Sequence, residues 1–249
     1  MVALFTGMFR SGSTWAYNVA RVLLLSRSPA TFGEYRDDVG AALASRDAAV
    51  AHHLIKTHTP DAVGRALIRD GACCTICTYR NPLECIASHM ETFGAPFDGV
   101  LALAAEALPL LEFYTMATGV LFIAYEDITA RPEDVVGDIA NYLGVAISAA
   151  DATAVAERFS KDNVARFAAR LHDHATGKVG VPDAWDSVTL FSSRHVRTNP
   201  SPPDVVLSPA QLRHVLDRLG AFIDARGAFS GDLVRRLAQA RAALAQRAG

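Results

Sequence analysis

Short apolar runs alternate with longer amphipathic segments along the first 145 residues. Four of the runs predict strands: VALFT (2–6), HHLIKT (52–57), ACCTICTY (72–79) and VLFIAY (120–125). The stretch near PATFG (29–33) predicts a shorter fifth strand. Helical patterns lie between them, at 13–25, 60–70 and 82–93. Strands that are apolar throughout and separated by helices indicate a parallel sheet that is buried on both faces. The pattern therefore predicts an α/β protein with three layers, a central parallel sheet flanked by helices.

The remainder of the chain is predicted to be mainly helical. Segment 130–145 begins with Pro132 in its first turn, and later helices are expected at 207–224 and 234–247. The Pro-rich stretch TNPSPPD (198–204) predicts extended chain or loop. We expect one domain over 1–249, with a nucleotide-binding core at 1–145 and a mainly helical part at 146–249.

Composition narrows the functional classes. The 249 residues are 51% hydrophobic, and 24 Lys and Arg nearly balance 26 Asp and Glu. That balance argues against non-specific nucleic-acid binding, which needs a basic excess. The four cysteines at 73, 74, 77 and 85 crowd one region, which predicts buried reduced thiols. Without an apparent signal peptide or an apolar run of about 18 residues, a soluble cytoplasmic protein away from membranes is expected.

The loop FTGMFRSGSTW (5–15) leaves a predicted strand and enters a predicted helix. This geometry favours a phosphate site, because backbone N–H groups and the helix dipole attract an anion. Gly7 and Gly12 match the glycine spacing of the nucleoside-triphosphate P-loop. However, Ser13 stands where that loop has its lysine, and the cation is Arg10 instead. Alone, the loop is compatible with a small-molecule kinase or with a turn that binds nothing.

Residues 10–15, Arg-Ser-Gly-Ser-Thr-Trp, resemble the 5′-phosphosulfate loop of sulfotransferases that use 3′-phosphoadenylyl sulfate (PAPS), in their bacterial form. By that resemblance, Arg10 contacts the sulfate and the bridging oxygen, and Trp15 packs on the adenine. The residues that would hold the 5′-phosphate are Ser11, Gly12, Ser13 and Thr14.

The segment IKTHTP (55–60) ends the next strong strand and is similar to the Lys-Thr-His-x-Pro element of that family. The resemblance makes His58 the general base. A neutral imidazole suits removal of a proton from an attacking hydroxyl. Lys56 adds positive charge near the leaving group. Glu34 is the alternative base, because some sulfotransferase branches use a glutamate after the second strand.

Two further segments match the family in the same order. Arg80 ends a strand in CTYRNPLECIASHM (77–90), and Ser88 follows eight positions later. This is the family's spacing for an Arg and a Ser on the 3′-phosphate, and a guanidinium with a hydroxyl suits a dianion. Within 123–145, Tyr125 is expected to reach the adenine edge.

The resemblance weakens after residue 145. Segment 191–209 is the candidate lid over the 3′-phosphate, with Arg194, His195 and Arg197 as its basic residues. The family's Arg-Lys-Gly and Gly-Asp-Trp elements are absent there. Ser160 is a weaker candidate for nucleotide contact.

The expected activity is transfer of a sulfuryl group from PAPS to a hydroxyl or amine of a small molecule, without a metal. Two alternatives stay open, a small-molecule kinase and a non-catalytic nucleotide-binding protein. The missing lysine at Ser13 and the lack of a clear magnesium carboxylate argue against the kinase. The aromatic residues Phe32, Phe93, Phe97 and Trp185 favour an apolar or aromatic acceptor, and a homodimer is compatible with this expectation.

Overall fold

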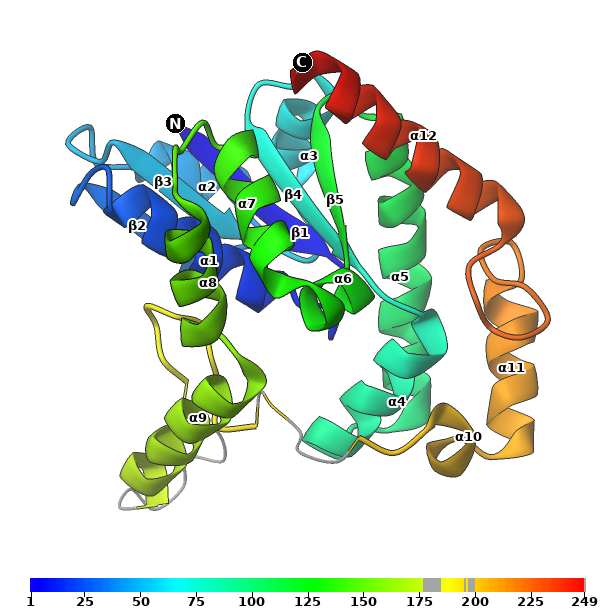
Figure 1. Ribbon diagram of the computed structural model, residues 1–249. Helices are drawn as coiled ribbons and strands as arrows, with labels where there is room; N and C mark the ends of the chain where they lie inside the picture. The colour runs from blue at the N-terminus through cyan, green and yellow to red at the C-terminus, as the bar shows by residue number, and fades with distance from the viewer. Residues whose placement is uncertain (177–184, 195, 197–199, 249) are drawn as a thin grey trace.

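A computed structural model describes residues 1–176, 185–194, 196 and 200–248 (Figure 1). Five strands form one parallel sheet in the order β2-β3-β1-β4-β5. Their bounds are β1 (Val2–Gly7), β2 (Thr31–Tyr35), β3 (His52–Lys56), β4 (Cys74–Tyr79) and β5 (Val120–Ala124). All five predicted strands are confirmed, and the weak prediction near 29–33 is shifted toward the C-terminus by about two residues.

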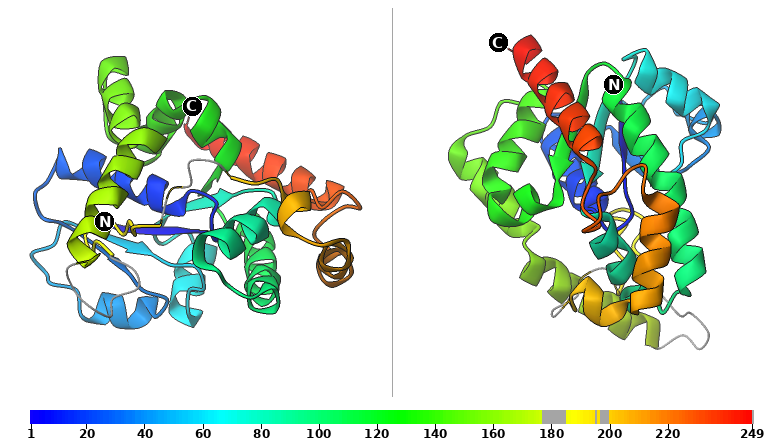
Figure 2. Two further views of the ribbon diagram at one scale, coloured as in Figure 1. Left: turned by 90° about the horizontal axis from the view of Figure 1, so that it is seen from below. Right: turned by 90° about the vertical axis from the view of Figure 1, so that its right-hand side faces the viewer.

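Helices cover both faces of the sheet, and each face has its own apolar core. One face packs against α1 (Ser13–Leu25), α6 (Tyr125–Ala130), α7 (Pro132–Tyr142), α8 (Ala149–Arg158) and α9 (Lys161–Thr176). The other packs against α2 (Val39–Ala44), α3 (Ala62–Arg69), α4 (Pro82–Phe93), α5 (Phe97–Met116), α11 (Pro209–Leu219) and α12 (Gly231–Ala248). Figure 2 shows α5, α11 and α12 grouped on that second side. The predicted three-layer α/β fold is therefore confirmed, and its buried central strands explain their apolar sequences.

Helix α5 is the main element that the sequence pattern did not predict. Its apolar residues spread around most of the helix, so it lacks the one-sided period of a surface helix. By length and composition it could cross a membrane, but its buried residues belong to the core behind the sheet and it contacts β1 and β4. The buried apolar residues of α5 thus pack between the sheet and the helices α4, α11 and α12.

Two predictions about proline have different outcomes. The stretch 198–204 is predicted to be extended or loop, and its described residues 200–202 are non-helical. Pro203 and Asp204 instead begin the short helix α10 (Pro203–Val206), because proline is compatible with a first helical position. The helix predicted at 130–145, with Pro132 in its first turn, is confirmed as α7, which is two residues shorter at its start and three at its end. The chain breaks at Arg131, between α6 and α7, and Pro132 starts the second helix because it lacks the N–H that would continue the first.

The strand order brings the ends of β1, β3 and β4 together. β1 lies between β3 and β4, and all three run in the same direction. In register, Phe5 lies beside Lys56 and Gly7 lies beside Thr78. The loops that follow these strands therefore meet at one edge of the sheet, where open α/β folds bind their ligands.

Gly7 is required by the close approach of β1 to β4. Its φ is +124°, and a Cβ placed on it would lie 2.0 Å from the carbonyl oxygen of Thr78. We predict that Gly7→Ala lowers the free energy of unfolding by more than about 3 kcal/mol, measured by chemical denaturation. Gly94→Ala is the control, because Gly94 also has positive φ (+63°) but meets nothing within 4 Å. It should cost only about 1 kcal/mol, and equal losses would contradict the steric argument.

Candidate functional site

The loop between β1 and α1 is fixed to the end of β4. The Met8 N–H donates to the Thr78 carbonyl at 3.2 Å, and the Ser11 hydroxyl lies 2.6 Å from the Thr78 hydroxyl. Ser11 is fully buried and its hydroxyl also donates to the Met8 carbonyl. Arg10 takes a left-handed conformation, with φ of 60°. The loop is therefore held in a tight curve before the helix begins.

Helix α1 begins beside this loop without a side-chain cap. Its N-cap is Gly12, at φ 92°, which has no side chain to accept from the first-turn N–H groups. Ser13 and Thr14 follow and are each 5% exposed. Uncapped N–H groups at a helix N-terminus and two hydroxyls form a suitable environment for a phosphate.

Arg10 and Ser88 meet across the site. The Arg10 Nε–H donates to Ser88 Oγ at 3.1 Å, and the guanidinium lies 5.7 Å from the ring centre of Phe93. Arg10 thus spans from the loop after β1 to α4, and it brings two of the predicted anion-binding residues into contact.

Arg80 lies just after β4 and near the backbone of Arg10. Its guanidinium carbon is 4.0 Å from the ring centre of Tyr125, and it pairs with Glu84 at 2.8 Å. A longer hydrogen bond of 3.5 Å reaches the Arg10 carbonyl. Tyr125, the first residue of α6, is therefore stacked on Arg80 in this structure, so both predicted nucleotide residues share one location.

Lys56 and His58 form a hydrogen-bonded pair after β3. Lys56 Nζ lies 3.0 Å from His58 Nε2, and His58 Nδ1 lies 3.0 Å from the Gly7 carbonyl oxygen. Since a carbonyl only accepts, Nδ1 carries the imidazole proton and Nε2 accepts from the lysine. Lys56 is 3% exposed.

Burial controls the charge of both residues. Burial and the neighbouring Lys56 lower the pKa of His58 to about 3, so this imidazole is neutral at physiological pH. Burial also lowers the pKa of Lys56 to about 8, although the negative charge of Asp37 raises this pKa in part. Lys56 therefore keeps its positive charge at neutral pH, but at a cost to the folded state.

Asp37 is a site residue that the sequence pattern did not reveal. Its Oδ1 accepts from the Thr57 hydroxyl and from the N–H groups of His58 and Thr59 at 2.7–3.1 Å. Its Oδ2 accepts from the Tyr35 hydroxyl at 3.1 Å. Burial alone would raise the pKa of Asp37, but these hydrogen bonds lower it overall. The turn that carries His58 is thus anchored by a carboxylate about 20 residues earlier, and only tertiary structure brings the two together.

His89 is a second residue that was missed. Its ring lies 5.0 Å from the ring of Phe9 and 4.8 Å from that of Phe93, centre to centre. Burial and the Arg10 charge lower its pKa to about 4. Its position directly after Ser88 in the 77–90 motif was the one signal available in the sequence.

Glu34, the alternative base, faces away from Lys56. In the paired strands β2 and β3, Glu34 lies beside Ile55, and Tyr35 lies beside Lys56. Because neighbouring side chains on a strand point to opposite faces, Glu34 and Lys56 lie on different sides of the sheet. The Glu34 carboxylate is bonded to His53 Nε2 at 2.8 Å and to Arg36 at 3.0 Å. This arrangement favours His58 over Glu34 as a base.

The remaining predicted residues lie around α1. Trp15 Nε1 donates to the Phe159 carbonyl at 3.1 Å, which ties α1 to the end of α8. The Ser160 hydroxyl accepts from the Asn163 N–H, so it caps α9. In the candidate lid, Arg194 is exposed in a turn, whereas His195 and Arg197 lie outside the described residues.

The chain just before the lid is attached to α1. The Asn18 side chain donates to the Thr189 carbonyl at 2.6 Å, and the Tyr17 hydroxyl donates to the Val188 carbonyl at 3.2 Å. The described part of the candidate lid therefore starts beside the helix whose N-terminus forms the phosphate environment.

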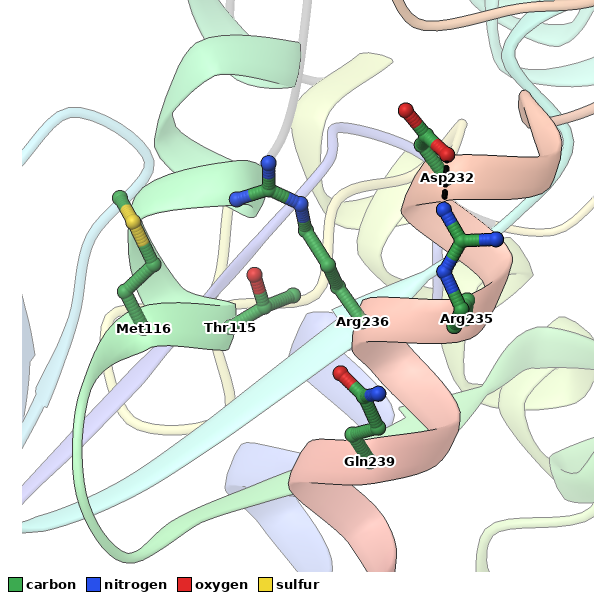
Figure 3. A pocket seen from close by; sticks show the side chains of 6 residues that line it. All are labelled: Thr115, Met116, Asp232, Arg235, Arg236 and Gln239. Carbon is green, nitrogen blue, oxygen red and sulfur yellow. Dashed lines mark hydrogen bonds and ion pairs between the residues drawn. The ribbon is translucent and has the colours of Figure 1, made fainter.

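A surface hollow of about 380 Å³ lies elsewhere, between the end of α5 and the start of α12 (Figure 3). Arg236 reaches from α12 toward α5 and lies 3.5 Å from Glu112. The residues that line the hollow are Thr115, Met116, Asp232, Arg235, Arg236 and Gln239. None of the predicted site residues is among them, so this hollow is separate from the candidate site.

Three solved structures resemble this chain. Retinol dehydratase in a complex with retinol and PAP matches with TM-score 0.61 at 13% identity, over 88% of this chain and 80% of that one. The same enzyme with androsterone and the inactive cofactor PAP matches with TM-score 0.63 at 11% identity and the same coverage. Mouse sulfotransferase SULT7A1 with PAP matches with TM-score 0.58 at 14% identity, over 95% of this chain and 88% of that one.

At these identities the likeness shows the fold, which is the sulfotransferase fold that the motifs implied. No protein-family model matches the sequence, and no curated protein matches it.

The charge on Lys56 should destabilise the folded protein. The pKa of Lys56 is about 8 in the folded chain, lower than the ordinary value of 10.5. At pH 7 the lysine is therefore charged in both states, and its charge lowers the free energy of unfolding. We predict that Lys56→Met raises the free energy of unfolding at pH 7 by about 2 kcal/mol, and that the gain disappears as pH rises above about 10.

Lys161→Met is the control for this measurement by chemical denaturation, because Lys161 is exposed at the start of α9. It should change stability by no more than about 0.5 kcal/mol. A loss of stability in Lys56→Met would show that burial of the charge is fully compensated in the folded state.

Proposed function

We propose that this chain, which has the sulfotransferase fold, transfers a sulfuryl group from PAPS to a hydroxyl or amine of a small molecule. The observation that carries the proposal is the convergence of three strand ends. The end of β3 and the loops after β1, β3 and β4 bring Arg10, Lys56, His58 and Arg80 to one edge of the sheet. The cation lies inside the phosphate loop, on Arg10, and Ser13 replaces the P-loop lysine, so a kinase is not favoured.

The residues around α1 suit the 5′-phosphate of the donor. The first-turn N–H groups and the hydroxyls of Ser13 and Thr14 would hold it. Ser11 contributes through its backbone, because its hydroxyl is already bonded to Thr78. Trp15 and Tyr125 would flank the adenine.

Arg80 and Ser88 would bind the 3′-phosphate. Arg10 already joins Ser88 to this region, and Arg80 bonds to the Arg10 carbonyl. Arg80 would exchange its Glu84 partner for the phosphate. This exchange is favourable because a phosphate dianion accepts hydrogen bonds more strongly than one carboxylate. Arg194, His195 and Arg197 remain the proposed closing residues of the lid.

The reaction is an in-line displacement at sulfur. The acceptor oxygen forms a bond to sulfur, its proton passes to His58 Nε2, and the bond from sulfur to the 5′-phosphate oxygen breaks. Adenosine 3′,5′-bisphosphate (PAP) leaves with the electron pair of that bond. Arg10 and Lys56 stabilise the negative charge on the leaving oxygen. The Gly7 carbonyl holds the imidazole tautomer in which Nε2 can accept the proton.

The acceptor is expected to be apolar or aromatic. The ring of Tyr35 lies 6.1 Å from that of His58, and Tyr35 is 41% exposed. The ring of Phe93 lies under the guanidinium of Arg10, 5.7 Å from its carbon to the ring centre. Retinol and androsterone, which two of the similar structures contain, are ligands of this apolar type.

His58→Gln tests the base. Incubation with PAPS and a panel of apolar alcohols, phenols and amines should give a product that is heavier by one SO₃ group, detected by mass spectrometry. We predict that His58→Gln lowers turnover by about 10² or more and leaves PAP affinity unchanged, because the base acts on the acceptor. His214→Gln is the control, since His214 is exposed on α11. Undiminished turnover in His58→Gln would contradict the assigned role.

Arg80→Met tests the 3′-phosphate site. Loss of charge-assisted hydrogen bonds should weaken PAP binding by about tenfold or more in calorimetry. ADP lacks the 3′-phosphate, so its affinity should change little in the same variant. Arg69→Met is the matched control, because Arg69 is exposed and pairs only with the neighbouring Asp70 among the ion pairs of the described residues. Equal losses for PAP and ADP would place Arg80 elsewhere.

A further inference from the structure

The catalytic nitrogen of the proposed base is already occupied. His58 Nδ1 donates to the Gly7 carbonyl, so Nε2 carries the lone pair, and Lys56 Nζ lies 3.0 Å from it. An acceptor hydroxyl must give its proton to this same Nε2. In the ligand-free protein the lysine and the acceptor therefore compete for one lone pair.

Lys56 is poorly neutralised where it lies. It is 3% exposed, and among the ion pairs of the described residues none includes it. Its partners are the neutral imidazole and the ring face of Tyr35, 5.0 Å from Nζ. The nearby carboxylate of Asp37 is directed to the Thr57 hydroxyl, two backbone N–H groups and the Tyr35 hydroxyl. A buried cation with uncharged partners gains most from an anion placed beside it.

We propose that Lys56 is a donor-sensing latch on His58: it blocks Nε2 in the free protein, and the anionic 5′-phosphate of the bound nucleotide, which PAPS and PAP share, draws its ammonium away. This rests on the function proposed above. Lys56 then acts on proton transfer through His58, as a positioning residue, in addition to its charge on the leaving group.

The other charged groups near His58 do not substitute for this latch. Asp37 contacts the His58 backbone N–H and not its ring. His89 is neutral, because its pKa is lowered to about 4. Arg10 is bonded to Ser88 and lies over Phe93. Lys56 is thus the group whose movement would both free Nε2 and remove a positive charge from the imidazole, which raises its basicity.

The latch orders the reaction. Before the donor binds, an acceptor hydroxyl finds no free lone pair on His58, and after the donor binds it finds a stronger base. Acceptor alcohols should therefore bind more weakly to the free protein than to the PAP complex. The device also prevents a dead-end complex in which an acceptor occupies the base before the donor arrives.

Imidazole nitrogen resonances test the latch in the full chain. The protein is labelled with ¹⁵N-histidine, and the His58 resonances are assigned by their loss in His58→Gln. Saturating PAP should move the Nε2 resonance of His58 toward that of an imine nitrogen without a hydrogen bond. In Lys56→Met this resonance should lie near that position without PAP, and PAP should shift it much less. His53 is the internal control, because its Nε2 is bonded to Glu34 on the other face of the sheet.

The outcomes separate the two proposals. PAP binding, followed by the melting temperature, together with the expected shift supports the latch. PAP binding with an unmoved His58 Nε2 resonance, or an equal shift in Lys56→Met, overturns the latch and leaves the proposed function intact. Absence of PAP binding to the wild-type protein overturns both.

Discussion

The contact between the β1–α1 loop and the end of β4 determines the geometry of the candidate site. Gly7 approaches the Thr78 carbonyl so closely that no side chain fits, and Ser11 bonds to the Thr78 hydroxyl. This contact sets the curve that directs Arg10 toward α4 and leaves the first turn of α1 uncapped. The Gly7 carbonyl, at the end of the same strand, also fixes the tautomer of His58. One backbone junction therefore positions the residues that are proposed to bind an anion and the residue that is proposed to accept a proton.

Charge is distributed unevenly at this edge of the sheet. Arg80 has a carboxylate partner, but Lys56 is held by a neutral imidazole and an aromatic ring. Keeping Lys56 charged in a buried position lowers the stability of the folded chain. A site that binds an anionic nucleotide recovers this free energy on binding, which is a common relation between stability and function.

The sequence was sufficient for the sheet and for the motifs at the strand ends. Strands such as β1 and β4 are apolar because both faces are covered, and the Gly7–Trp15 loop has a recognisable pattern of glycines and hydroxyls. Helix α5 was missed because it is apolar on most sides. Asp37 could not be found, because its role depends on tertiary hydrogen bonds to the turn at His58. The pairing of Lys56 with His58 Nε2 likewise required coordinates, since the sequence shows only that the two residues lie two positions apart.

We propose above that the edge formed by β1, β3 and β4 binds an adenosine 3′,5′-bisphosphate. Isothermal titration calorimetry of the wild-type protein with PAP and, separately, with ATP and Mg²⁺ tests it most directly. We expect much tighter binding of PAP, because the cation lies in the loop at Arg10 and the proposed 3′-phosphate site lies at Arg80 and Ser88. Tighter binding of ATP with Mg²⁺ would contradict it and would indicate a kinase-type site.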